Sequence, residues 1–169
     1  MCSNKSLKLS LLFATILFAA NGFSAEIDGV PFFKQDREKC GPASLASVLA
    51  YYGVPIQPDA ISESTYNPKL KGSLITDLEN YARRMGFVTE SGQGDMERLK
   101  QFIDNKKPVI TLVDLGLWIA AKPHYLVLFG YNAEGFIMHD GENPSQTCPF
   151  SEFYRMWEKM GRVYLLVYR

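Results

Sequence analysis

The pattern of apolar residues predicts an α+β fold with an antiparallel sheet. Helical spacing dominates the first hundred positions, whereas continuous apolar runs, typical of buried strands, lie mostly after residue 108. Helices followed by strands favour this arrangement over a doubly wound parallel sheet. The 169 residues suffice for one domain with a substantial core, and no repeat or long linker divides the chain.

Capping residues and glycines mark the ends of the expected elements. Ser73 and Asp95 suit helix N-termini, and Gly53 and Gly86 suit helix ends. The turn residues of 132–135 join two strands into a hairpin. The expected helices are Gly41–Tyr52, Asp59–Glu63, Leu74–Met85, Asp95–Ile103 and Glu152–Met160. The expected strands are Val30–Phe33, Phe87–Glu90, Pro108–Val113, Tyr125–Phe129, Gly135–His139 and Arg162–Tyr168, and Thr65–Gly72 is expected to be a loop.

The first 25 residues have the pattern of a secretory signal peptide. Lys5 and Lys8 precede the apolar run Leu9–Ala20, which is too short to span a bilayer comfortably, and small residues follow. We expect cleavage after Ser24 or Ala25, with an uncleaved membrane anchor as the alternative. Residues 26–169 would then form an exported domain in the periplasm or outside the cell, which contacts the membrane only through the N-terminal segment.

Composition excludes several classes of function. The 18 basic and 18 acidic residues balance, so the chain lacks the positive charge that nucleic-acid binding requires. Three cysteines are too few for a disulfide scaffold or a four-thiolate zinc site, and no close Cys or His spacing predicts a metal site. We therefore expect no nucleic-acid partner and no metal, and we also expect a monomer.

Cys40 is the candidate nucleophile. It lies directly before the helix predicted over Gly41–Tyr52, where free N–H groups and the helix dipole favour a thiolate. The same N–H groups can stabilise an oxyanion, and the Gln35 side chain can supply a second donor. Gly41 has no side chain and would let a substrate backbone approach. Taken alone, Cys40 is equally consistent with a core residue or a disulfide partner.

His124 is the candidate base, because it begins an apolar strand and imidazole titrates in the useful range. If the hairpin turns about Asn132, Asp140 faces His124 and can orient it, while His139 points to the opposite face as a surface residue. A turn centred on 133–134 would break this register. Asn143 is the alternative orienting residue.

The sequence also resembles a known family. The segment Val30–Ala46, with Gln35 and Cys40-Gly-Pro-Ala, is similar to the start of the bacteriocin-processing cysteine peptidases that cleave double-glycine leaders. His124-Tyr-Leu-Val-Leu-Phe-Gly-Tyr resembles the histidine strand of that family, and Asp140 falls where its aspartate ends the next strand. The resemblance implies a papain-like α+β fold and thiol-dependent peptide cleavage, without a cofactor. Gly141 follows Asp140 here, where the family has proline.

Other aromatic and sulfur residues have two interpretations each. Trp118 and Tyr125 flank His124 and would line a peptide groove or pack in the core. Cys148 would be a free thiol or a disulfide partner of Cys40. A silent peptide-binding module on the same fold and a cell-wall amidase or acyl transferase with the same dyad remain alternatives to the peptidase.

Overall fold

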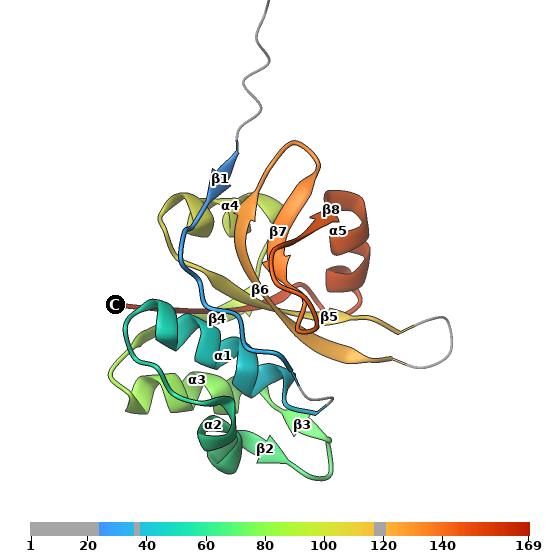
Figure 1. The fold of residues 1–169 in the computed structure, drawn as a ribbon. Helices are drawn as coiled ribbons and strands as arrows, with labels where there is room; N and C mark the ends of the chain where they lie inside the picture. Colours follow the sequence, from blue (N-terminus) through green and yellow to red (C-terminus); the bar gives the residue numbers. More distant parts are fainter. Residues whose placement is uncertain (1–23, 36–37, 117–120) are drawn as a thin grey trace, which may run out of the picture.

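The computed structural model describes residues 24–35, 38–116 and 121–169, and helices cover both faces of an antiparallel sheet (Figure 1). The helices are α1 (Cys40–Tyr51), α2 (Pro58–Thr65), α3 (Ile75–Arg84), α4 (Met96–Asp104) and α5 (Phe150–Glu158). The strands are β1 (Ala25–Glu26), β2 (Tyr66–Asn67), β3 (Gly72–Ser73), β4 (Val88–Gln93), β5 (Val109–Asp114), β6 (Pro123–Tyr131), β7 (Gly135–His139), β8 (Gln146–Pro149) and β9 (Val163–Tyr168).

The main sheet of the described residues has the strand order β4-β9-β5-β6-β7-β8, and the short β1 pairs with the end of β6. Every pair in it is antiparallel, which confirms the predicted α+β arrangement. β2 and β3 form a separate two-stranded sheet. The central strand β6 is therefore paired along its length and carries the candidate base at its beginning.

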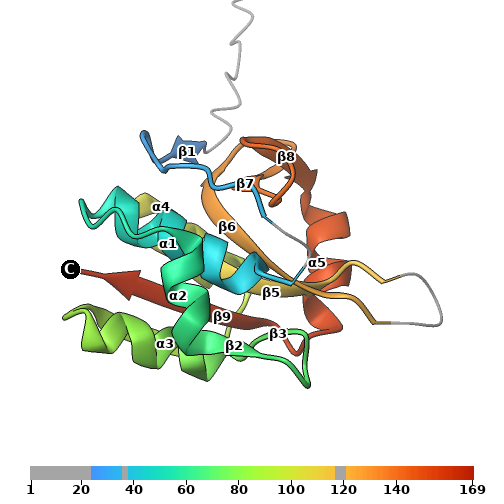
Figure 2. The same cartoon turned by 60° about the horizontal axis from the view of Figure 1, so that its bottom comes forward.

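The main sheet separates two apolar cores (Figure 2). Helices α1, α2 and α3 pack on one face, against side chains such as Tyr125 and Val127 of β6. Helices α4 and α5 pack on the other face, against Leu126 and Leu128. Successive residues of β6 thus point into different cores, as the period of a strand requires.

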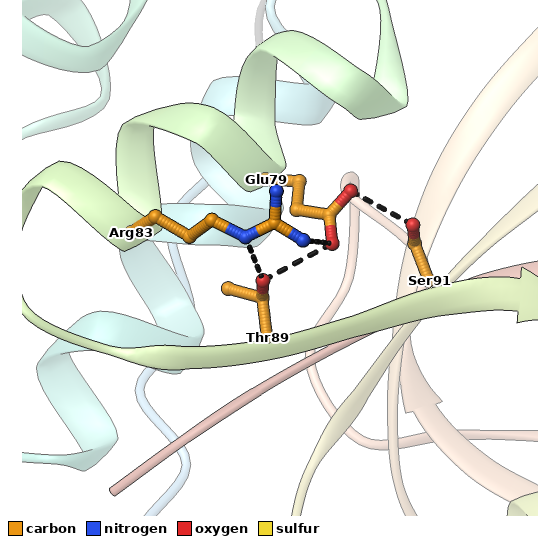
Figure 3. Close-up of polar contacts among 4 residues, drawn as sticks. All are labelled: Glu79, Arg83, Thr89 and Ser91. Atoms are coloured by element: carbon orange, nitrogen blue, oxygen red, sulfur yellow. Dashed lines mark hydrogen bonds and ion pairs between the residues drawn. The ribbon is translucent and has the colours of Figure 1, made fainter.

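A buried carboxylate ties α3 to the edge of the sheet. Glu79 is only 6% exposed, and it accepts hydrogen bonds from Arg83 Nη2 at 2.5 Å, Thr89 Oγ1 at 3.0 Å and Ser91 Oγ at 2.8 Å (Figure 3). A buried charge is tolerated only with such partners. The cluster connects α3 with β4 and so holds the α1–α3 layer against the sheet.

Most predicted elements are confirmed, and local signals explain why. Asp95 caps α4 by accepting a hydrogen bond from Arg98 N at 2.7 Å. Gly53 and Gly86 follow helices with φ of +79° and +82°, a conformation that favours glycine. The 132–135 turn closes the β6–β7 hairpin, with Asn132 Oδ1 accepting from the Glu134 and Gly135 amides.

Three local predictions were wrong. Val30–Phe33 forms no strand, because its backbone carbonyls accept hydrogen bonds from side chains and not from a neighbouring strand: Pro31 O accepts from Ser47 Oγ. The predicted loop 65–72 contains β2 and the start of β3. Ser73 does not cap α3, since its hydroxyl donates to Thr65 Oγ1, and Leu74 occupies the cap position with 46% of its surface exposed.

The predicted signal peptide lies almost entirely outside the described residues. Ala25, at its end, pairs with Tyr131 as part of β1. In the described part of the chain, no helix has the length and apolar character needed to cross a membrane.

Candidate active site

Cys40 is the first residue of α1 and packs against the start of β6. The residue is buried at 8% exposure, and the backbone N–H groups of Cys40, Gly41 and Tyr125 lie close enough to the sulfur to lower the pKa of the thiol. Space above Gly41 is already filled: a Cβ there would lie 3.0 Å from Leu78 Cδ1 and 3.2 Å from Tyr125 Cδ2. Gly41 therefore permits close packing of α1 on β6 rather than the approach of a substrate from that side.

The predicted low pKa of Cys40 was wrong. Burial raises the pKa of the thiol, and this effect outweighs the lowering by the Tyr125 and Gly41 amides and by the charge of Lys122. A helix N-terminus stabilises a thiolate, but removal of the sulfur from water disfavours it more. Burial thus favours the neutral thiol of Cys40 over the thiolate.

His124 is the second residue of β6 and pairs with Val113 of β5. Its Nε2 lies 2.7 Å from the backbone oxygen of Asp140. A carbonyl can only accept, so Nε2 carries the proton and Nδ1 keeps a lone pair. Burial lowers the pKa of His124, and the charge of Lys122 lowers it further, against a raising effect of Asp140. The imidazole is therefore a neutral base at neutral pH.

The predicted hairpin register was wrong by two residues. His139 pairs with Val127, because the turn is centred on 133–134 and the ladder is interrupted at Phe129. A shift of two keeps every side chain on its predicted face, so His124 and Asp140 become diagonal rather than direct neighbours. This explains why they still meet, although not through the carboxylate.

The Asp140 carboxylate accepts hydrogen bonds from the turn that follows it, residues 141–143. Oδ1 accepts from Glu142 N at 2.8 Å and Asn143 N at 2.6 Å, and Oδ2 accepts from Asn143 Nδ2 at 3.4 Å. The backbone oxygen, not the side chain, holds His124. Asn143 contacts Asp140 and not the imidazole, so it supports the orienting group indirectly.

Gln35 lies beside this turn. Its backbone N–H donates to Gly141 O at 2.9 Å, and its Nε2 lies 3.4 Å from Ser44 Oγ, a weak contact that leaves the amide available to a substrate. Gln35 Oε1 is buried without a partner in the described residues. A Cβ on Gly141, whose φ is +91°, would lie 2.1 Å from Gln35 Oε1.

Gly141 is the residue that the sequence interpretation missed as part of the site. Glycine suits this position, because its φ of +91° is unfavourable for other residues and because a Cβ there would displace the Gln35 amide. The sequence did contain an indication of this, because a glycine follows Asp140 directly where the family that the sequence resembles has proline.

His139 was expected at the surface, but it is buried at 5% exposure. Its Nε2 donates to Val30 O at 3.0 Å, and its Nδ1 accepts from Ser145 N at 3.3 Å. Burial lowers its pKa. Its side chain points away from the face of His124, as predicted, and both of its nitrogens are occupied.

The structure decides between the two interpretations of Cys148 and of Tyr125. Cys148 lies in β8, and both it and Cys40 are free thiols, so the disulfide alternative is not formed. Tyr125 is 4% exposed and donates through its hydroxyl to Ser73 O, which places it in the core. Trp118 lies outside the described residues. No group of three acidic, His or Cys side chains within the described ranges is placed to hold a metal ion.

Comparison with known proteins agrees with this geometry. The chain resembles the peptidase domain of Streptococcus ComA, an ABC transporter (24% identity, TM-score 0.70, 83% of this chain and 98% of that one). It also resembles a C39-like peptidase from Bacillus anthracis (18% identity, TM-score 0.72, 87% of this chain and 98% of that one). A third similar structure is a double glycine motif protease from an AMS/PCAT transporter (24% identity, TM-score 0.69, 85% of this chain and 93% of that one). These likenesses confirm the papain-like α+β fold.

No curated protein sequence is significantly similar to the chain. The model of the Peptidase_C39 like family matches residues 27–165, which include all of the proposed site. With most of its length covered by that match, the chain belongs to the Peptidase_C39 like family.

Proposed function

We propose that this protein is a cysteine peptidase in which Cys40 attacks the carbonyl carbon of a peptide bond. The observation that carries the proposal is the arrangement at the start of β6. The backbone amide of Tyr125 lies close enough to the Cys40 sulfur to lower the pKa of the thiol. The adjacent residue His124 has its Nε2 fixed on Asp140 O, which leaves the basic Nδ1 without a hydrogen-bond partner among the described residues.

The reaction begins from neutral groups. The Cys40 thiol gives its proton to His124 Nδ1 as the sulfur bonds to the carbonyl carbon, and the carbonyl π electrons move to oxygen. The Cys40 N–H and the Gln35 side-chain amide stabilise that oxyanion. His124 then protonates the leaving amine, which breaks the C–N bond and leaves a thioester on Cys40. Water, deprotonated by Nδ1, releases the acid and restores the thiol.

Asp140 is the positioning residue of this mechanism. Its carbonyl holds the tautomer and the orientation of His124, and its carboxylate fixes the 140–143 turn that presents the carbonyl. Such a hydrogen bond also stabilises the imidazolium that forms during the reaction.

The proposed substrate is a peptide. One structural relative is described as a double glycine motif protease in complex with a leader peptide. Peptides with two glycines before the scissile bond are therefore the first substrates to test, together with a random peptide pool that makes no assumption about sequence.

The test compares the purified full chain with Cys40→Ala and with the matched cysteine control Cys148→Ala, each with and without reductant. We expect new amino termini in the peptide pool from the parent and from Cys148→Ala, and a loss of about 10⁴-fold in Cys40→Ala. Equal cleavage by Cys40→Ala would overturn the assignment. An unreactive Cys40 with tight peptide binding would indicate the binding module, and release of fragments from peptidoglycan but not from peptides would indicate the amidase.

We further propose that residues 1–25 direct export. Lys5, Lys8 and the short apolar run support this, and the cleavage site after Ser24 would leave β1 complete. Fractionation of producing cells and amino-terminal sequencing test the proposal. Full-length protein confined to the cytoplasm would contradict it.

A further inference from the structure

A pocket of about 400 Å³ opens beside His124, on the α5 side of the sheet. Its lining includes the apolar side chains Leu126, Met138 and Met156, each under 10% exposed, and the Cys148 thiol. An apolar pocket with a few polar groups at its edge is the usual form of a ligand site.

The position of the pocket relates it to one half of a peptide substrate. Tyr125 points toward α1 and shares a core with Cys40, whereas Leu126 points into the opposite core and lines the pocket. His124 lies two residues before Leu126 in β6, so its side chain is on the pocket side of the strand, and it lines the pocket next to Tyr125. The nucleophile holds the acyl half of the substrate, and the imidazole protonates the amine of the other half. A pocket that borders the imidazole and contains no residue of α1 therefore receives the part after the scissile bond.

The charges at the pocket are predominantly acidic. Glu142 and Glu152 line it with exposed side chains, and neither forms an ion pair with another described residue. Asp140 also lines it, although its carboxylate is bound by backbone amides. Lys122 is the one basic side chain among the described lining residues. Burial raises the pKa of Cys148 to about 11, and the negative charge of Glu152 adds to this effect, which places that carboxylate near the thiol in the pocket.

We propose that this pocket binds the side chain of the residue directly after the scissile bond and selects lysine or arginine there. The long alkyl part of such a side chain covers the apolar floor, and its charged end meets Glu142 and Glu152. Neither carboxylate has a cationic partner among the described residues, so a basic side chain gains more binding energy in the pocket than leucine does, and an acidic side chain is repelled. The proposal rests on the peptidase function proposed above.

The experiment digests a random peptide pool with the full chain and identifies the first residue of each newly formed fragment by mass spectrometry. We expect lysine and arginine to be enriched at this position over leucine and glutamate. In Glu142→Gln/Glu152→Gln, the ratio of basic residues to leucine should fall about tenfold. Because the ratio is measured within one pool, a general change in activity does not affect it.

Glu158→Gln is the matched control, since Glu158 lies on α5, is exposed and does not line the pocket. It should keep the preference of the parent. Cleavage that depends on Cys40 but shows no basic preference, or a preference that the double variant retains, would overturn the pocket assignment alone. The absence of any Cys40-dependent cleavage would overturn the peptidase function and the pocket assignment together.

Discussion

The two histidines lie on neighbouring strands and share several features, but only His124 keeps a ring nitrogen without a hydrogen-bond partner among the described residues. Both have a pKa lowered by burial, and both direct Nε2 at a backbone carbonyl. They differ at the other nitrogen: Ser145 N donates to Nδ1 of His139, whereas Nδ1 of His124 has no hydrogen-bond partner among the described residues. A free lone pair, not burial or pKa, therefore distinguishes the histidine that we propose as the base from His139.

The surroundings of the two rings agree with this distinction. His139 contacts the rings of Phe32 and Phe129, with centroids 5.3 and 4.5 Å away, and connects β7 to the segment that leads to Cys40. His124 borders a pocket and the residue against which Cys40 packs. The first ring completes a core, and the second remains accessible to a reacting group.

The largest expected effect comes from replacing each histidine by glutamine. Glutamine can still donate to a carbonyl, but it cannot take up a proton. We expect His124→Gln to lower kcat/KM by about 10³-fold or more, because no base then accepts the thiol proton. His139→Gln should change kcat/KM by less than about tenfold. Cleavage of the peptide pool measures both, and comparable losses in the two variants would refute the comparison.

The turn after β7 provides the next test, because it places Gln35. In Gly141→Ala, the new Cβ would displace the Gln35 amide, and the loss of one oxyanion donor should lower kcat by about 10²-fold. The same loss is expected in Gln35→Ala. The double variant should be no worse than Gln35→Ala alone, since the clash is then absent.

Gly86→Ala controls for backbone strain in this test. Gly86 has a similar φ of +82°, but a Cβ there meets nothing within 4 Å. It should lose some stability and keep its activity. Additive losses in the Gly141 and Gln35 variants would show that Gly141 acts through something other than the amide.

A smaller but distinct effect concerns the resting state of the pair. Because the pKa of Cys40 is raised and that of His124 is lowered, both are neutral near pH 7. Alkylation of Cys40 by iodoacetamide should therefore rise about tenfold per pH unit from pH 6 to 8, following the thiolate fraction. Mass spectrometry of the labelled peptide separates Cys40 from the other cysteines. A constant rate across this range would indicate a preformed thiolate–imidazolium pair instead.

The smallest expected effect is on stability. The pKa of His139 is lowered in the folded state, so the folded protein binds fewer protons at this residue than the unfolded chain does. Its contribution to the free energy of unfolding is therefore complete above the ordinary histidine pKa and decreases as the pH falls through that value. His139→Gln removes this group. This variant should have a free energy of unfolding about 1–2 kcal/mol lower than the parent at pH 7.5, because glutamine replaces the hydrogen bonds of His139 imperfectly. Its free energy of unfolding should then fall less than that of the parent when the pH is lowered to 5.5. Urea unfolding at both pH values measures this, and an unchanged pH dependence would contradict the role of His139.

Local signals in the sequence were sufficient for many elements. Pro42, an apolar stripe and Gly53 predict α1 almost to its ends, and Asp95 predicts the start of α4. Asn132 predicts the β6–β7 hairpin. These signals succeed because caps, turns and helical stripes act within a few residues along the chain. The two-residue strands were not predictable, because such strands exist only through their partners.

The sequence by itself determined which reactive groups the chain carries, on which elements they lie and, through the two-residue period of a strand, which face each occupies. Only the tertiary structure decided their chemical state. The burial that raises the pKa of Cys40 and the Gln35 amide that fills the space beside Gly141 come from residues distant in sequence, and the interruption of the β6–β7 ladder at Phe129 moves Asp140. Desolvation and packing depend on what surrounds a group in space, and neighbours along the chain do not specify that.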